Sequence, residues 1–129
     1  MGAAYGTSKS AIGIANLGMV EPTKIFKALI PIIMAGILGI YGIIVAVLLN
    51  GSIPSTLEPR NGYKLLAAGF CCGLSSLAAG LAIGVAGDAG VRAYAQQDGV
   101  FVGMILILIF AEAIGLFGLI VAIIMQSSG

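Results

Sequence analysis

Three long apolar stretches, almost without charge, most constrain what this chain can fold into. Residues 28–57 and 65–87 contain no charged side chain, and residues 99–129 contain only Glu112. About 20 consecutive apolar residues are enough for a helix to cross the hydrocarbon core of a bilayer. A membrane strand would need polar residues in alternation, which these stretches lack. The sequence therefore predicts an all-α membrane protein.

The charge content excludes several other classes. Charged residues make up 9% of the chain, whereas a soluble domain has about 25%, so a water-facing surface could not be covered. The net charge of +1 gives no electrostatic reason to expect nucleic acid as a partner. Histidine is absent, and no glycine cluster follows a strand or precedes Lys-Ser or Lys-Thr. We therefore expect no hydrolytic site, no cofactor and no metal.

Short polar segments divide the chain, which is one domain by length. Gly, Pro, Asn and Gln mark these segments as turns or loops. The helices are expected at residues 2–17, 24–49, 63–92 and 100–125.

An internal repeat relates the two halves of the chain. Residues 41–46 resemble residues 117–122 at a shift of 76, and residues 2–6 resemble residues 80–84 at a shift of 78. The two-residue difference falls in a connecting turn, where insertions are tolerated. The repeat predicts a bundle of four helices built from two duplicated hairpins.

The first hairpin comprises residues 1–50 and the second residues 63–129, in one membrane domain. The repeat leaves the helix before Gly80 without a counterpart before Gly2. The first helix is therefore expected to be incomplete, and we expect the chain to be truncated at its amino terminus.

Glu112 is the residue most suggestive of function. A charged side chain near mid-membrane costs roughly 3 kcal/mol or more, so the protonated form is favoured there. At the shift of 76, Gly36 takes its place in the first hairpin, which leaves one such carboxyl per chain. A hydrogen bond between helices is the alternative role, although Ser, Thr, Asn or Gln usually serves it. We predict a proton carrier that needs a cation from another polypeptide, because no Lys or Arg lies at this depth.

Small residues recur along one face of the predicted third helix, within about 80°. Such a face lets helix backbones approach closely, which favours packing in a ring over packing in a monomeric bundle. The glycines assigned to ring packing are Gly69, Gly73, Gly80, Gly84 and Gly87.

Other polar residues near the helix ends have simpler interpretations. Asp88 and Arg92, spaced i and i+4, are expected to form an ordinary ion pair. Cys71 and Cys72 point apart on a helix and are interpreted as packing residues. Basic residues near the two hairpin turns outnumber those at the opposite end by four to two, so the turns are expected to be cytoplasmic.

Several segments carry a family resemblance. Residues 85–92, the Gln96-Gln97 pair and residues 101–112 resemble the 16 kDa proteolipids, or c subunits, of the eukaryotic V-type proton-pumping ATPase. Residues 2–7 and 31–36 extend the match to the first half, while residues 52–62 match least.

The resemblance implies a four-helix protomer of a rotating homo- or hetero-oligomeric c-ring, with Glu112 at the proton-carrying position. It implies contact with membrane lipid, with the a subunit, which supplies an arginine, and with the d subunit and the central stalk. ATP hydrolysis would lie on other polypeptides, so the chain would not be an enzyme. The expected location is a vacuolar or other acidic endomembrane. A structural, non-pumping oligomer and an inactive truncated product stay open as alternatives.

Overall fold

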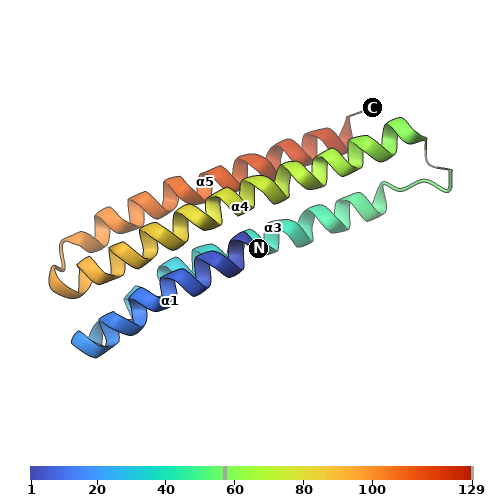
Figure 1. Ribbon diagram of the computed structural model, residues 1–129. Coiled ribbons are helices and arrows are strands. Elements are labelled where there is room, and N and C mark those ends of the chain that lie inside the picture. The colour runs from blue at the N-terminus through green and yellow to red at the C-terminus, as the bar shows by residue number, and fades with distance from the viewer. Residues whose placement is uncertain (57, 129) are drawn as a thin grey trace.

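The computed structural model describes residues 1–56 and 58–128 as a bundle of long helices (Figure 1). The described residues contain no strand, so the expectation of an all-α protein is confirmed. The elements are α1 (Gly2–Val20), the 3-10 helix η1 (Pro22–Lys24), α2 (Ile25–Ala28), α3 (Ile30–Gly51), α4 (Pro59–Gln96) and α5 (Val100–Ser127).

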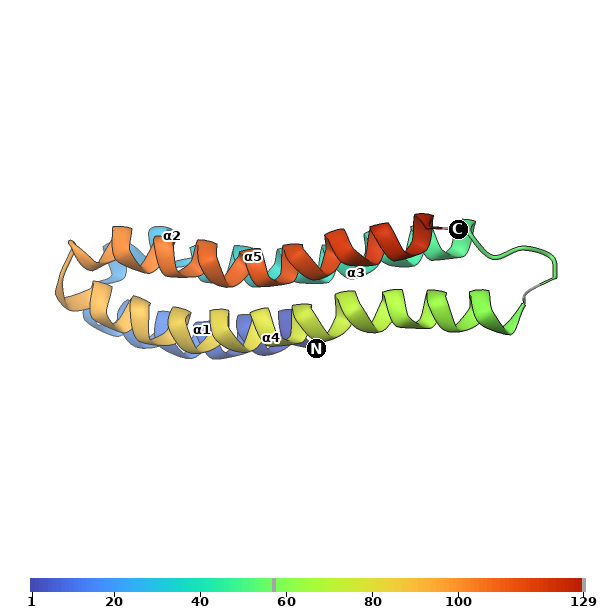
Figure 2. The ribbon, with the colours of Figure 1, turned by 90° about the horizontal axis from the view of Figure 1, so that it is seen from above.

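The long helices form two layers. Figure 2 shows α1 and α4 in one layer and α3 and α5 in the other. The chain starts near the middle of the bundle, so α1 runs beside only the later half of α4 (Figure 1). The two hairpins thus lie side by side, and the first is shorter in its α1 arm.

The helix boundaries differ from those predicted. The predicted helix 63–92 extends four residues further at each end, as α4. Pro59 starts it because proline is preorganised for the first helical position. The predicted helix 24–49 is interrupted at Leu29, where Pro31 lacks the N–H that a continuous helix would use. The other two helices each continue two or three residues past their predicted ends.

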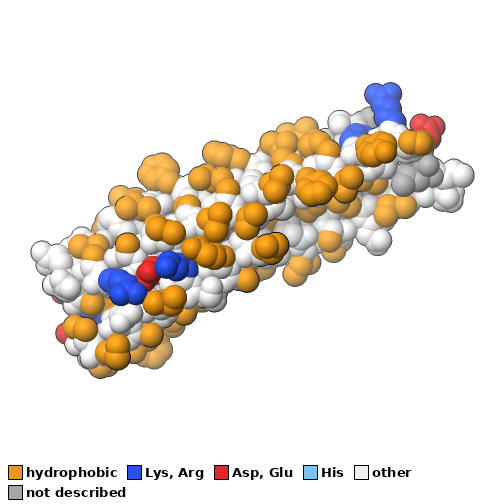
Figure 3. Space-filling model, in the orientation of Figure 1, with side chains coloured by type: hydrophobic (Ala, Val, Ile, Leu, Met, Phe, Trp, Pro, Cys, Tyr) orange, Lys and Arg blue, Asp and Glu red, His pale blue; other side chains and the backbone are white. Residues whose placement is uncertain are grey.

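Three helical segments are long and apolar enough to cross a membrane: Pro22–Gly51, Pro59–Gln96 and Val100–Ser127. On the face shown in Figure 3, charged side chains gather in two groups toward the ends of the bundle, with a broad hydrophobic surface between them. Large apolar side chains such as Phe110 and Phe117 are exposed to the surroundings of the bundle. The chain is an integral membrane protein.

Glycines bring the backbones of α1 and α4 together. A Cβ added to Gly6 would lie 3.0 Å from the Gly80 carbonyl oxygen, and one added to Gly84 would lie 3.2 Å from the Gly6 Cα. Gly87 is more crowded, because a Cβ there would lie 2.5 Å from the Ser10 hydroxyl oxygen and 2.8 Å from the Pro31 Cβ. Much of the predicted glycine face therefore packs within one chain.

The first two glycines of that face, Gly69 and Gly73, are not crowded by neighbouring atoms. A Cβ on Gly69 would meet only Leu49, at 3.8 Å, and one on Gly73 would meet nothing within 4 Å. Neither position is crowded by α1. A role for this glycine face in packing one protomer against the next stays a prediction.

Lys24 connects the two hairpins at the end of the bundle that holds the turns within each hairpin. Its ammonium pairs with Asp98, donates a hydrogen bond to the Tyr94 carbonyl oxygen at 3.0 Å, and lies 4.8 Å from the centre of the Tyr94 ring. Asp98 lies between α4 and α5, outside both spans, and its bond to Lys24 lowers the pKa of its carboxyl. This contact links the first hairpin to the second at the turn end.

Candidate functional site

Glu112 lies on α5, twelve residues after Val100 and fifteen before Ser127. At 1.5 Å per residue it is about 18 Å from the start of the helix. A hydrocarbon core is about 30 Å thick. The residue therefore lies deep within the span, as its position in the sequence indicates.

The carboxyl group of Glu112 is buried without a partner. Both oxygens are inaccessible, and no donor among the described residues hydrogen-bonds to either of them. The ion pairs found in the described part of the chain all lie elsewhere, at Asp88 and Asp98. An ionised carboxylate in apolar surroundings without a cation or donor is strongly disfavoured. This site thus suits a neutral carboxyl until a cation reaches it.

The surroundings of Glu112 are formed by close contact of α5 with α3 and α4. Leu108, one turn before, is fully buried. A Cβ added to Gly115, about one turn after, would lie 2.5 Å from a Leu38 methyl and 3.4 Å from the Ala79 Cβ. These contacts hold α5 against its neighbours on both sides of the carboxyl.

Tyr41 of α3 is the polar side chain that faces Glu112. Its phenol lies close enough to the carboxyl for the two groups to interact electrostatically. Its ring edge also lies 3.6 Å from the position that a Cβ on Gly115 would take. Tyr41 therefore places a hydroxyl beside the carboxyl.

The other singled-out residues lie outside this site. Arg92 donates a 2.7 Å hydrogen bond to Asp88, which confirms the expected pair, and Lys9 of α1 adds a second contact to Asp88 at 3.8 Å. Cys71 and Cys72 are free thiols. Within the described residues, no three His, Cys, Asp or Glu side chains cluster as metal ligands would.

Comparison with known families agrees with this architecture. The family model for the C subunit of ATP synthase matches residues 1–49 and 66–125. The chain belongs to this family.

Curated relatives narrow the family to one branch, the V-type proton ATPase 16 kDa proteolipids, or c subunits. The second such proteolipid of Caenorhabditis elegans is 56% identical over 131 residues, covering 99% of this chain and 81% of the relative. The proteolipid of Ascaris suum is 56% identical over 133 residues, with the same coverage of both chains. The human proteolipid is 55% identical over 127 residues, 98% of this chain and 82% of the relative. The resemblance to the V-type proteolipids is thus confirmed.

Membership of this family establishes the general role of the chain. It is a non-catalytic proteolipid of a proton pump, and its family assembles as a ring in the membrane sector.

The sequence did not single out two polar residues whose surroundings the structure reveals, Tyr41 and Ser76. Tyr41 corresponds to Phe117 at the repeat shift of 76, so its hydroxyl occurs only in the hairpin that lacks the carboxyl. That difference was a usable signal. Ser76 was noted only as part of the small-residue face, yet its hydroxyl is buried without a hydrogen-bond partner in the described part of the chain.

Proposed function

We propose that Glu112 is the proton-carrying group of this proteolipid and is protonated and deprotonated in turn as the ring rotates. The single observation that supports this most is the pair of buried, unpartnered carboxyl oxygens midway along α5. A fixed structural contact would give these oxygens a donor, whereas a carrier must exchange its proton.

The carrier cycle requires a cation that the chain itself does not place at the site. In the described residues, Lys and Arg side chains form their ion pairs near the turn end, not with Glu112. We therefore assign the cation to an arginine of the a subunit. A cation within about 4–6 Å favours the carboxylate, so passage past that arginine would release the proton, and passage back into lipid would require a new one.

The remaining partners and the location follow the same proposal. The hairpin turns, at Glu21 and at Asp98, would face the cytoplasm and meet the d subunit and the central stalk. The membrane would be that of a vacuole or another acidic compartment. The basic residues near these turns support the orientation through the positive-inside tendency.

A hydrophobic carbodiimide tests the state of the carboxyl. Such reagents react with protonated carboxyl groups in apolar surroundings, so we expect one adduct per chain, on Glu112, together with loss of proton pumping by the assembled complex. Mass spectrometry of the digested chain locates the adduct. Glu58, which is exposed at the start of α4, is the internal control and should stay unmodified. An adduct on Glu58 with none on Glu112 would contradict the proposal.

A further inference from the structure

Lys9, Asp88 and Arg92 form a charged cluster between α1 and α4 that the proposed proton carrier does not use. The Asp88 carboxylate lies 3.8 Å from the Lys9 ammonium and accepts a 2.7 Å hydrogen bond from the Nε of Arg92. The Asp88 side chain is 15% exposed, whereas those of Lys9 and Arg92 are 38% and 47% exposed. The two cations are therefore more open to the surroundings of the bundle than the carboxylate between them.

The charged cluster has a net positive charge, because two cations share one carboxylate. α1 contains no other charged residue, and Glu21, the next acidic residue along the chain, lies twelve residues beyond Lys9. Arg92 donates a hydrogen bond only through Nε, so neither its Nη groups nor the Lys9 ammonium hydrogen-bonds to the described residues. Several charged donors thus stay free, and a monoanion with more than one acceptor oxygen suits them.

The charged cluster borders the hydrocarbon core along α4. Residues 65–87 carry no charge and span about 34 Å as a helix, close to the thickness of the core, about 30 Å. Asp88 follows this stretch directly. A Cβ added to Gly84 would lie 3.0 Å from the Lys9 Cβ, so Lys9 of α1 lies beside the same part of α4. The cluster is therefore at the level where phospholipid headgroups begin.

Exposed apolar side chains continue from the charged cluster toward the middle of the bundle. Leu81 precedes Asp88 by seven residues and Val85 precedes Arg92 by seven, so each pair lies on one face of α4. Both Leu81 and Val85 are exposed. Figure 3 shows basic and acidic side chains grouped beside hydrophobic ones on the face that it displays. An anion with acyl chains can contact both the cations and this apolar strip, whereas a free phosphate can contact only the cations.

We propose that Lys9 and Arg92 bind the phosphate group of an anionic phospholipid. Asp88 holds the Arg92 guanidinium through Nε, and the free Nη groups donate to phosphate oxygens in the paired geometry that guanidinium and phosphate favour. The Lys9 ammonium adds a second contact with the phosphate, and the acyl chains lie along Leu81 and Val85. A lipid with one negative charge balances the cluster, so a zwitterionic lipid fits it less well.

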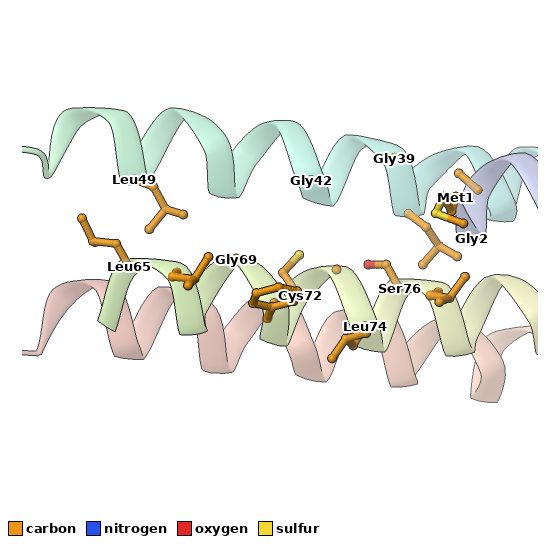
Figure 4. A pocket seen from close by; sticks show the side chains of 16 residues that line it. Met1, Gly2, Gly39, Gly42, Leu49, Leu65, Gly69, Cys72, Leu74 and Ser76 are labelled. Carbon is orange, nitrogen blue, oxygen red and sulfur yellow. The ribbon is translucent and has the colours of Figure 1, made fainter. Parts of the chain in front are cut away.

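This site is separate from an apolar groove of about 670 Å³ between α3 and α4. Figure 4 shows the groove, with Gly42 on its α3 side and Gly69 and Ser76 on its α4 side. No charged side chain of the described residues lines it. The groove therefore offers no cation to a phosphate, and lipid binding that depends on a cation of the charged cluster does not report the groove.

Native mass spectrometry of the assembled ring provides the test. The ring is extracted from membranes with equal amounts of phosphatidylglycerol and phosphatidylcholine that carry the same acyl chains, and the lipids retained by each ring are counted. We expect one phosphatidylglycerol per chain, preferred over phosphatidylcholine by about tenfold. An excess of inorganic phosphate should not displace it, because free phosphate lacks the contacts with Leu81 and Val85.

Variants of the chain assign the retained lipid to the charged cluster. Lys9→Gln and Arg92→Gln should each lower retention of phosphatidylglycerol about tenfold, the size expected for the loss of one charge-assisted hydrogen bond. Arg92→Lys keeps the charge but lacks the paired Nη donors, so its retention should be intermediate. Lys9→Gln is an independent probe, because Lys9 makes no hydrogen bond to Asp88. Circular dichroism shows whether each variant is folded.

Arg60→Gln is the matched control. Arg60 is exposed at the opposite end of α4, and no ion pair within the described part of the chain holds it. Its variant should retain phosphatidylglycerol as the unaltered ring does.

Three results would overturn the proposal. One is equal retention of the two lipids by the unaltered ring. Another is equal retention of phosphatidylglycerol by the Lys9→Gln, Arg92→Gln and Arg60→Gln rings, which would indicate unspecific attraction. The third is displacement of the lipid by inorganic phosphate, which would indicate a site for a free anion.

Discussion

Replacing Glu112 with glutamine is expected to abolish ATP-driven proton transport while leaving the ring assembled. Glutamine has nearly the same shape as a protonated glutamate, so the contacts of α5 with α3 and α4 at Leu108 and Gly115 persist. Its amide, however, neither binds nor releases a proton in the relevant range. Acidification of vesicles by the assembled complex should therefore fall to the background seen without ATP.

The matched control for this change is Glu58→Gln. Glu58 is exposed just before α4, outside the apolar part of the span, so the same chemical change there should leave acidification unaltered. Assembly is read separately, from the size of the detergent-extracted ring. Retained acidification in the Glu112→Gln complex would show that another group carries the proton, and a structural role for Glu112 would then be the better account.

Gly80→Leu is expected to have the largest effect on the structure. A Cβ at this position would overlap the backbone of Gly2 on α1. Overpacking a core with side chains costs about 1–3 kcal/mol, and the cost should be higher here because the obstructing atoms belong to a helix backbone. We expect α1 to separate from α4, the midpoint of thermal unfolding to drop by several degrees, and ring assembly to be lost.

Circular dichroism of the purified chain measures this unfolding, and gel filtration in detergent measures assembly. Gly36→Leu is the matched control, because a Cβ on Gly36 meets nothing within 4 Å. The two variants differ only in where the leucine is placed. Equal thermal midpoints and equal assembly for both would contradict the close packing of α1 on α4.

The fold followed from the sequence because membrane helices depend on local composition. The apolar runs predicted the spans, and the repeat predicted the two hairpins, which appear as α1 to α3 and α4 to α5. The break at Leu29 was not predicted, and α4 begins at Pro59, four residues before the predicted start. Each boundary depends on a nearby proline, Pro31 or Pro59, because proline can either begin a helix or interrupt one.

The site was only partly predictable. The depth of Glu112 follows from counting residues along α5, and its importance follows from the energetic cost of a carboxylate in lipid. The contrast with Phe117 could single out Tyr41 in the sequence, but its place beside Glu112 depends on how α3 packs against α5 near Gly115.

The sequence also did not show that the glycines of this face have different surroundings. All five glycines recur at helical spacing, so the pattern alone treats them as equivalent. Only the packing shows that Gly80 and Gly84 contact α1, while Gly69 and Gly73 line an open groove.

The most direct test of the central claim is to observe the proton on Glu112 during pumping. Infrared difference spectroscopy of the complex, with ¹³C-labelled glutamate in this proteolipid, reports the carbonyl band of protonated glutamate carboxyl groups. The carrier account predicts a deuterium-sensitive, isotope-shifted band in the resting complex that loses intensity when ATP is added and is absent from the Glu112→Gln complex. A band that stays constant during steady pumping, or that persists in the Glu112→Gln complex, would contradict it.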